Sequence, residues 1–551
     1  MNKEGSKYFC EVVKMHVDEN TYSFDEFLKA RDEYNDFLDN EFLQLAAKHY
    51  IKDEWEQLYE KIKTLSEETS FHYRHIANEI SKIENQPKIE HYNAYNKRVD
   101  RIIRTKQQAD MEEDLFKRAL FSKETSKWEQ VLSRFLFHHN GEAGIMCPVA
   151  CTDGLVDILR TFEHELNDEL KEILRHVTEG IDGDFGIGAQ FMTEIQGGSN
   201  IPANVLKAVK AGDHWRLYGS KFFCSAIHAD YSVVTARVDN TEHVGTFIVP
   251  LWKTRERKER NHLVINRLKS KLGTTELASA EVIFNGAKAY QIGPLEKGVA
   301  IAVGIVLTKS RLDIGAASSA FMLRAVREAL QYSQFREVFG RRIEDFPLAK
   351  GQLLDMEHTA KRTTAAVFKI YDEFFKQENW YHKQLSEEEK KRQFVLRELI
   401  LLQKIKAAHD TVDTVRTAIS IFGGNGVIED FSSLPRLFRD AMVNELWEGP
   451  KNVLLAQIHR DIKRASKWYE PKAFIKDLLE GVDGQIVERF QERMQSLMDI
   501  DLYAEPNEQT IRDAKEWARF CDELFYEYQE QAWKEIGDAP IVKTYSFKKQ
   551  L

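Results

Sequence analysis

The sequence is poor in two features that would each define a class of protein. Its five cysteines among 551 residues are too few and too scattered for a disulfide framework, which favours a reducing compartment. Its longest apolar run, residues 299–307, is far too short to cross a bilayer, and charges interrupt the N-terminal stretch 1–13, which has no signal-peptide core. These absences predict a cytoplasmic, soluble protein without a membrane span.

An excess of positive charge is also absent. The chain has 78 basic and 88 acidic residues, a formal net charge of −10, so no overall field attracts nucleic acid or anionic lipid. Nucleic acid is therefore an unexpected partner, although a local basic patch stays open. The apolar content of 43% and charged content of 30% are ordinary for a globular protein, and the length suggests several domain-sized units.

No cluster of side chains has the spacing of a metal site. Cys147 and Cys151 form a CPVAC pair, but no further histidine or cysteine follows at zinc spacing, which favours structural thiols. His138 and His139 resemble a pair of metal ligands, yet no third ligand is nearby. A helix end or a surface pair is the favoured interpretation, and we expect no metal.

Hydrophobic periodicity predicts helices first, then strands, then helices again. Residues 21–140 have helical spacing, and the segment around Pro87 is expected to be irregular. A helical pattern also covers Asp153–Val177. From Asp184 the sequence is rich in glycine and β-branched residues, with a charged loop, Lys253–Arg260, expected to be a solvated hairpin connection. The expected strands are His214–Cys224, Tyr231–Val238, Val244–Leu251 and Ala280–Phe284.

Helical spacing returns at Glu296 and continues to about Glu378. Small residues near its start, such as Gly304 and Gly315, allow close packing of helices. Further helices are expected over Ser386–Phe422, Pro450–Lys467 and, as a final tail, Pro471–Ile536. The chain is therefore predicted to be mainly α with an inserted β domain, divided into residues 1–183, 184–295, 296–467 and 468–551.

The stretch Ala418–Asn452 has the strongest chemical signals. Gly423, Gly424 and Gly426 expose backbone amides that can approach a phosphate or another large polar ligand, a signal that is weak on its own. Glu448 follows Trp447 and precedes Gly449-Pro450, just before a predicted helix. A short stiff turn can aim such a carboxylate as a general base, whereas the plainer interpretation is a glutamate favoured by the helix dipole.

Two further segments have hydroxyl groups beside glycines or aromatic rings. Residues 190–199, QFMTEIQGGS, can hydrogen-bond ring heteroatoms and phosphates, although alone they indicate only a transition from strand to loop. Residues 219–225, GSKFFCS, can equally be a hydrophobic strand with one hydroxyl. Arg311, on a predicted helix, would ordinarily be a surface residue.

Taken together, FGGNG, LFRDA and LWEGPKN resemble the acyl-CoA dehydrogenase family, with its GGxG turn, RDA step and [YW]EG glutamate in this order. The resemblance covers about residues 90–465, and MTEIQGGSN, KFFCSAIHADYSVV and NELWEGPKN look most like the AidB-like branch. It implies a helical domain, a β-barrel or sandwich and a four-helix bundle, followed here by a C-terminal helical extension.

The family resemblance implies FAD as cofactor and Glu448 as catalytic base. Thr193 would reach the flavin edge, Phe223 would lie against the ring, Ser225 would donate to flavin N5, and Arg336 with Phe339 would reach a neighbouring subunit's FAD. The implied cofactor-binding residues are Gln190, Met192, Thr193, Gly198, Ser199, Phe223, Ser225, Arg336, Phe339, Gly423, Gly424 and Asn452. The implied substrate-binding residues are Ser199, Arg311 and Glu448.

The sequence departs from the family pattern at three positions. Ser310 stands where some members place their catalytic glutamate, which leaves Glu448 as the sole matching base. Ser420 stands where many members have a glutamine, and Pro450 replaces a threonine or serine. Some adenine or pyrophosphate contacts are therefore expected to differ.

Three functions fit this resemblance. The first is α,β-dehydrogenation of an acyl-CoA thioester, in which Glu448 removes the α-proton and the β-hydride passes to flavin N5. The expected partners are acyl-CoA, an acceptor such as electron-transfer flavoprotein, and further copies of the chain in a dimer or tetramer. The second is an AidB-like DNA-binding or regulatory flavoprotein with little dehydrogenase activity. The third is a flavin monooxygenase or nitroalkane oxidase on the same fold.

Overall fold

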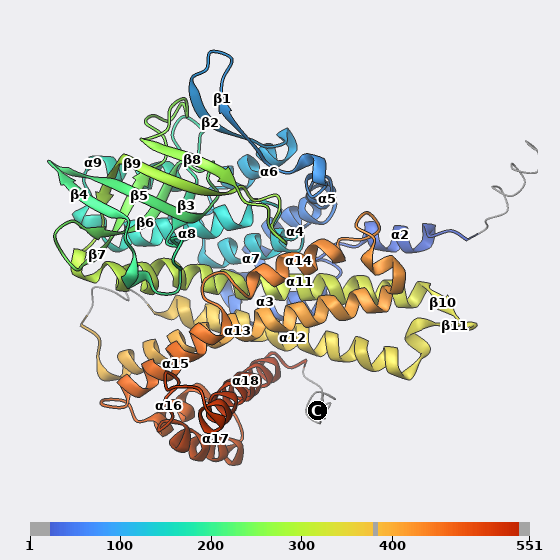
Figure 1. Cartoon of the computed structure of the whole chain (residues 1–551). Helices are drawn as coiled ribbons and strands as arrows, with labels where there is room; N and C mark the ends of the chain where they lie inside the picture. The colour runs from blue at the N-terminus through green and yellow to red at the C-terminus, as the bar shows by residue number, and fades with distance from the viewer. Residues whose placement is uncertain (1–21, 378–383, 539–551) are drawn as a thin grey trace, which may run out of the picture.

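The computed structural model describes residues 22–377 and 384–538 of the chain. The N-terminal stretch 1–13, with Cys10, lies outside these residues, so the structure does not bear on its interpretation. Figure 1 shows a mainly helical molecule: the β-rich part lies above one end of a set of long helices, and the last helices lie below them. None of the helices in the described ranges is long and apolar enough to span a membrane.

The N-terminal part is helical, as predicted. Side chains that accept a hydrogen bond from a first-turn amide begin several of its helices, for example Thr105, Ser126 and Asn167 before α6, α7 and α9. Its helices are α2 (Asp25–Glu33), α3 (Glu41–Ile51), α4 (Trp55–Glu67), α5 (Tyr73–Ile80), α6 (Lys106–Lys117), α7 (Lys127–His138), α8 (Met146–Thr161) and α9 (Asp168–Thr178). The short turns η1 (Lys52–Glu54), η2 (Glu68–His72), η3 (Ile83–Asn85) and η4 (Glu163–Glu165) lie between them.

The segment after Pro87 is a β-hairpin, so the prediction of an irregular segment was wrong. Strands β1 (Lys88–Tyr92) and β2 (Arg98–Ile103) pair antiparallel. The side chain of Asn93 accepts hydrogen bonds from the amides of Tyr95 and Lys97, both at 3.0 Å. Asparagine favours such tight turns, and this local turn chemistry was not recognised in the sequence.

The middle of the chain forms a closed β structure. The strands are β3 (Gly188–Phe191), β4 (Lys207–Ala211), β5 (His214–Ser225), β6 (Tyr231–Val238), β7 (Val244–Pro250), β8 (Leu263–Leu268) and β9 (Ser279–Gln291), with η5 (Ile201–Ala203) between β3 and β4. Their order is β3-β6-β4-β5-β9-β7, and β7 also pairs with β6, which closes the ring. Four of these strands match predicted ones, whereas β3, β4 and β8 were not predicted.

The charged loop 253–260 is mostly exposed, as predicted, but it is not the connection of a hairpin. The strands on either side, β7 and β8, both pair with β9 rather than with each other. The Arg257 guanidinium binds Asp230 and Asp184, and Arg260 is only 7% exposed beneath Trp252. Long arginine side chains can thus anchor a loop that composition alone indicates as exposed.

Long helices follow the sheet. They are α10 (Gly298–Ile301), α11 (Leu307–Phe335), α12 (Pro347–Lys376), α13 (Glu387–Phe422), α14 (Leu434–Asn444) and α15 (Lys451–Ala465). Short elements between them are η6 (Leu295–Lys297), the π-helical η7 (Ala302–Val306), η8 (Ile343–Asp345) and η9 (Gly423–Val427). A two-stranded hairpin, β10 (Glu337–Val338) with β11 (Arg341–Arg342), separates α11 from α12 within the range where helices were predicted.

Helices α11, α12 and α13 pack against one another (Figure 1). Gly315 allows the close contact between α11 and α13, because a Cβ atom there would come within 2.2 Å of the Gln403 amide nitrogen. This contact is the kind of close packing that small residues were expected to permit.

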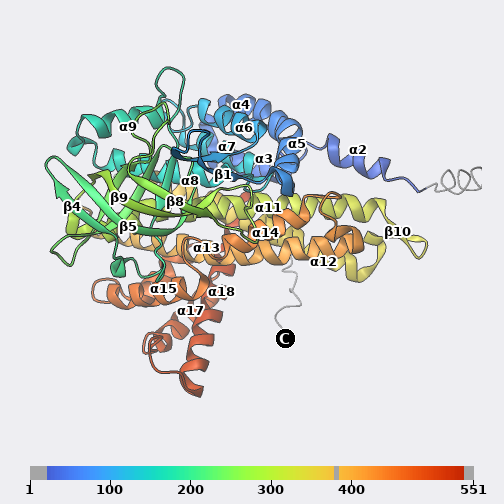
Figure 2. The same ribbon diagram turned by 45° about the horizontal axis from the view of Figure 1, so that its top comes forward.

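The C-terminal region is helical, as predicted for Pro471–Ile536. It consists of α16 (Pro471–Leu478), α17 (Gly484–Leu497) and α18 (Glu508–Ile536), and Figure 2 shows these helices projecting from the side of the bundle. Trp517 donates a hydrogen bond to the Leu455 carbonyl, and the Gln529 amide donates to the Thr363 hydroxyl, both at 3.0 Å. The division of the chain into four domains stays a prediction.

Candidate active site

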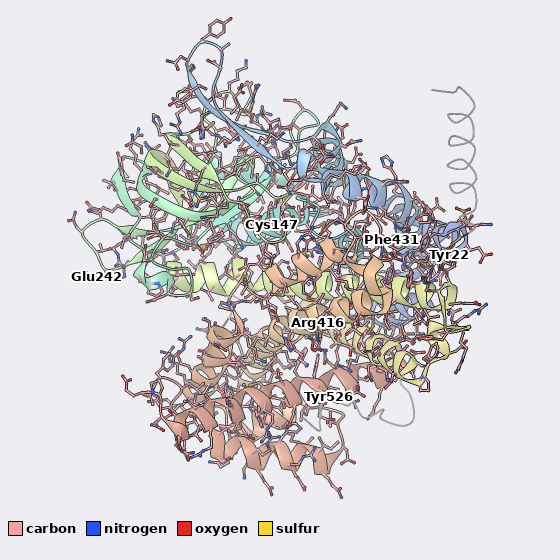
Figure 3. The ribbon with its side chains drawn as sticks, turned by 45° about the vertical axis from the view of Figure 1, so that its right-hand side comes forward. Tyr22, Cys147, Glu242, Arg416, Phe431 and Tyr526 are labelled. Carbon is pink, nitrogen blue, oxygen red and sulfur yellow. The ribbon has the colours of Figure 1, made fainter. Side chains whose placement is uncertain are left out.

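A cavity lies between α7, α8, α11 and the segment that follows α14. Figure 3 locates it by Cys147, where the β structure meets the long helices. Most of its surface is apolar, and its polar residues include Gln190, Ser310 and Glu448. The apolar lining residues are Met146, Ala150, Ile314, Ala317 and Phe321. The cavity can therefore hold an apolar group beside a carboxylate.

Side chains from distant parts of the sequence hold Glu448 in the cavity wall. The Gln190 amide on β3 donates a hydrogen bond of 2.6 Å to the Glu448 carboxylate. The Arg311 guanidinium on α11 donates to the Glu448 carbonyl at 3.1 Å. The structure thus brings together three of the predicted site residues, and Ser310, whose hydroxyl oxygen lies 3.3 Å from the Gln190 amide nitrogen, adjoins them.

The backbone at Glu448 has an unusual conformation. Its φ is 60°, in the left-handed region that non-glycine residues rarely adopt, and Gly449 follows with a φ of 106°. The Lys404 ammonium on α13 donates hydrogen bonds to the carbonyls of Gly449 and Glu445, at 2.6 and 2.9 Å. A conformation of this kind costs about 1–3 kcal/mol and commonly marks a functional site. As predicted, the turn precedes a helix, although Pro450 is its N-cap and α15 begins at Lys451.

Burial raises the pKa of Glu448 above its usual range, while Arg311 and Lys404 oppose the shift. Burial also lowers the pKa of Lys404 to about 7 and that of Arg311 to about 10. The carboxylate therefore combines two properties of a general base, a fixed position and a basicity above that of an exposed glutamate.

His138 and His139 lie inside the molecule, so the surface interpretation of this pair was wrong, although α7 does end at His138. They are 4% and 2% exposed, and His138 lines the cavity with its Nε2 atom 3.1 Å from the Asp313 carboxylate. Helix α7 is buried on most sides, which the periodicity of its sequence did not reveal. Within the described part of the chain, no group of histidine, cysteine, aspartate and glutamate side chains could hold a metal ion.

Cys147 and Cys151 also line the cavity, one turn apart on α8. Both are free thiols, with their sulfur atoms 3.9 Å apart. The hydrogen bond to Cys151, together with burial, raises the pKa of Cys147 well above its usual value. A protonated thiol is a poor nucleophile, so Cys147 contributes packing rather than reactivity, and Cys151 is buried beside it.

The hydroxyl-bearing segments predicted to hold a cofactor are adjacent. The Phe222 amide donates a hydrogen bond of 2.9 Å to the Thr193 carbonyl, which joins residues 190–199 to the end of β5. Phe223 is 47% exposed, an unusual position for such a large apolar side chain. Met192, by contrast, is 7% exposed. Of the other predicted contacts, Ser199 and Asn452 are exposed and Gly198 packs against Thr193.

Four predicted cofactor residues lie far from Glu448: Arg336, Phe339, Gly423 and Gly424. Arg336 follows the end of α11, roughly 37 Å along that helix from Arg311. Its guanidinium lies 4.7 Å from the centre of the Tyr22 ring, which Figure 3 shows at the opposite side of the molecule from Glu242, with Cys147 between them. Gly423 and Gly424 end α13 close by, because Asn425 donates a hydrogen bond to Tyr332. One chain therefore does not bring these residues to the cavity.

Sequence reasoning missed three charged groups around the cavity: Lys404, Asp313 and Glu142. Each is a single residue within a longer helical pattern or loop, and no local motif distinguishes it. The CPVAC and double-histidine motifs did mark the cavity wall, but only the tertiary structure shows that both face the same space.

Two parts of the chain match known protein domains. Residues 189–287 match the acyl-CoA dehydrogenase middle domain, and residues 296–463 match the acyl-CoA dehydrogenase C-terminal domain. The chain is 32% identical over 399 residues to acyl-CoA dehydrogenase family member 11 of Caenorhabditis elegans, covering 68% of this chain and 62% of that protein. It is 27% identical over 377 residues to the AidB protein of Escherichia coli (strain K12), covering 66% of each. The chain thus spans somewhat less than two thirds of either relative.

The likeness extends to a solved structure. That of Caenorhabditis elegans ACDH-11 in complex with C11-CoA has a TM-score of 0.76 and 24% sequence identity, covering 93% of this chain and 92% of that one. The fold, including the helical extension, is therefore that of an acyl-CoA dehydrogenase.

Members of the matched family depend on FAD. The residues at the end of β5 and in the segment joined to it suit the isoalloxazine ring of FAD: the exposed Phe223 ring offers a flat apolar surface, and Thr193 and Ser225, both with hydroxyl groups, are partly exposed. At the distant turn, a Cβ atom on Gly423 or Gly424 would meet nothing within 4 Å. Open backbone of this kind suits the approach of a large polar ligand.

Proposed function

We propose that the chain is an FAD-dependent acyl-CoA dehydrogenase, because residues 189–287 and 296–463 match the middle and C-terminal domains of that family. The observation that carries the proposal is Glu448: a carboxylate in the wall of a mainly apolar cavity, held by Gln190 and Arg311. The proposed reaction is α,β-dehydrogenation of an acyl-CoA thioester.

Glu448 acts as the base in this proposal. The thioester makes the α-C–H acidic, and the α-proton moves to the Glu448 carboxylate, which becomes a neutral carboxylic acid. The Gln190 amide keeps the carboxylate in place, and the raised pKa of Glu448 brings its basicity closer to the working pH. When bound, FAD supplies the two-electron acceptor for the hydride that leaves Cβ.

Arg311 and Lys404 hold the turn that aims the carboxylate. Both bind backbone carbonyls, at Glu448 and at Gly449, so neither occupies the carboxylate oxygens. They stabilise the ionised base through space while leaving it free to accept a proton.

The character of the cavity is evidence that the acyl group is the part of the substrate that it encloses. Its mainly apolar lining favours a hydrocarbon group over a polar one beside the base. The complex of C11-CoA with ACDH-11 supports a chain of medium to long length. We further propose an electron-transfer flavoprotein as acceptor and an assembly of at least two copies.

The test is anaerobic titration of the purified holoprotein with acyl-CoA thioesters of increasing chain length. We expect a yellow protein with noncovalent FAD whose visible flavin absorbance is bleached by at least one thioester. A colourless protein that takes up no FAD would contradict the proposal. Bound FAD that no acyl-CoA reduces, together with retention of DNA at moderate salt, would favour the AidB-like regulatory role.

A further inference from the structure

A chain of three polar side chains ends at Ser225, beside the exposed Phe223. Ser225 and Ser279 are cross-strand partners at the ends of β5 and β9, and their hydroxyl oxygens are 2.8 Å apart. The Lys271 ammonium donates a hydrogen bond of 3.0 Å to the Ser279 hydroxyl. Ser279 is 1% exposed, whereas Ser225 is partly exposed.

The chemistry of the three groups fixes the direction of these hydrogen bonds. An ammonium has only donors, so the Ser279 oxygen must accept from Lys271. The single proton of Ser279 then points to Ser225, its only other partner within the described residues. The opposite direction would leave the proton of a buried hydroxyl without an acceptor, which costs about 1–3 kcal/mol. Ser225 therefore accepts from Ser279, and its own proton stays available to a ligand.

Lys271 is itself held on all sides. Besides Ser279, it donates to the Thr274 hydroxyl at 2.8 Å and to the Leu277 carbonyl at 3.1 Å. Burial lowers its pKa, while the nearby acidic groups oppose this and favour the ammonium. These groups are Glu142, Cys147, Asp440 and Glu276.

Strained backbone lies on both sides of this chain. Ala226, directly after Ser225, has a φ of 55°, and Thr274 has a φ of 50°. Such conformations persist in non-glycine residues only where the surroundings impose them. The positions of the three polar groups are thus set by the fold rather than by an exposed, adaptable loop.

We propose that Lys271, acting through Ser279, is a positioning residue that presents the Ser225 hydroxyl as a hydrogen-bond donor to the flavin ring of FAD. This rests on the proposed function, since it requires FAD beside Phe223. A preset donor near the ring would stabilise negative charge that arrives with a hydride, without any rearrangement during the reaction. If the Ser225 proton instead pointed to Ser279, the Ser225 hydroxyl could not donate to the flavin and would not stabilise this charge.

The test combines single and double variants of the FAD-loaded protein. The direct readout is the ¹⁵N resonance of flavin N5 in protein reconstituted with [5-¹⁵N]FAD, and the second is the rate of flavin reduction by acyl-CoA. We expect Ser225→Ala to shift the N5 resonance and to slow reduction by about 100-fold, the effect of losing one such donor. Ser279→Ala and Lys271→Met should shift the resonance in the same direction and slow reduction by about 10-fold.

The double variant distinguishes positioning from general damage. In the Ser225→Ala background, Ser279→Ala should add no further shift, because the chain of hydrogen bonds then has no end point. Thr274→Ala is the matched control: it removes another acceptor of Lys271 that does not lead to Ser225, and should leave the N5 resonance unchanged. Ser279→Ala also retains the Lys271 charge among the buried acids, so it remains informative if Lys271→Met fails to fold.

Two results would overturn the proposal. One is an unchanged N5 resonance in Ser279→Ala; the other is a shift caused by Ser279→Ala that is equally large in the parent protein and in the Ser225→Ala background. Either can occur in a protein that binds FAD and is bleached by acyl-CoA, which leaves the proposed function intact. A protein that takes up no FAD refutes the proposed function, and the positioning role with it.

Discussion

Glu448 and the Gly423-Gly424 turn lie in one stretch of sequence, but their surroundings in the tertiary structure differ. Around Glu448, three elements converge, and hydrogen bonds from Gln190 and Arg311 fix the residue. Around Gly423 the backbone is open, and Phe339, which follows α11 at the same end, is 96% exposed. The two regions lie near opposite ends of α11 (Figure 1), since Arg311 near its start contacts Glu448 and Tyr332 near its end contacts Asn425.

From this difference we expect one chain to build the whole of the proposed catalytic pocket but only part of the proposed cofactor site. Further apolar side chains are exposed near the distant turn, among them Leu348 at 86% and Val427 at 70%. Exposed apolar residues beside open backbone are typical of a surface that another molecule covers. We expect a second copy of the chain, with its FAD, to be that molecule, and the following variants test the two regions separately.

Glu448→Gln should have the largest effect. Glutamine keeps the size and hydrogen bonding of the side chain but cannot take the proton, so the rate of flavin reduction should fall by about 10⁴-fold, the upper end for a general base. Anaerobic stopped-flow measurement tests this, with FAD content expected to be unchanged. Glu445→Gln is the matched control, since Glu445 lies three residues earlier and binds His409. An undiminished rate in Glu448→Gln would place the base elsewhere.

Arg336→Ala should weaken FAD binding by about 10- to 100-fold, the effect of losing a hydrogen bond to a charged group. The chemical step at saturating FAD should change little, because Arg336 is far from Glu448. Titration of the apoprotein with FAD measures the affinity, and sedimentation measures the assembly. Arg416→Ala, an exposed arginine on α13, is the control. A monomer that binds FAD as tightly as the oligomer would contradict the shared site.

Arg311→Met should move the pH dependence of flavin reduction. The base must be ionised, so the rate rises with pH up to the pKa of Glu448, which burial has already raised. Loss of the nearby positive charge disfavours the carboxylate further and should move this rise to higher pH by about one unit. Arg311→Lys retains the charge and should move it less. A shift toward lower pH would show that Arg311 does not stabilise the ionised base.

Gly424→Ala should have the smallest effect. Its Cβ atom would point into open space, so the melting temperature should stay the same while FAD affinity falls severalfold. Gly315→Ala is the opposite control. There the added atom meets Gln403, which should destabilise the fold by about 1–3 kcal/mol without weakening FAD binding by the folded protein. Unchanged FAD affinity in Gly424→Ala would mean that no ligand approaches this turn.

The sequence by itself determined the order of helical, β and helical parts and the extent of the C-terminal helices, and it led to the prediction that Glu448 is the base. These follow from hydrophobic periodicity and from a motif whose residues are neighbours in the chain, so local information is sufficient. Local information failed where turn chemistry decided the outcome, as in the β1–β2 hairpin. It also failed where strand pairing did, since the strands on either side of the loop 253–260 both pair with β9.

Only the tertiary structure decided which residues meet. Lys404 reaches the turn after Glu448 from another helix, and Ser225 receives its hydrogen bond from a partner 54 positions away in the sequence. It also separated the glycine turn from Glu448, although that glutamate is only 22 positions after Gly426 in the sequence. Contacts between distant segments depend on how helices and strands pack, and packing is set by the whole set of buried side chains rather than by any short motif.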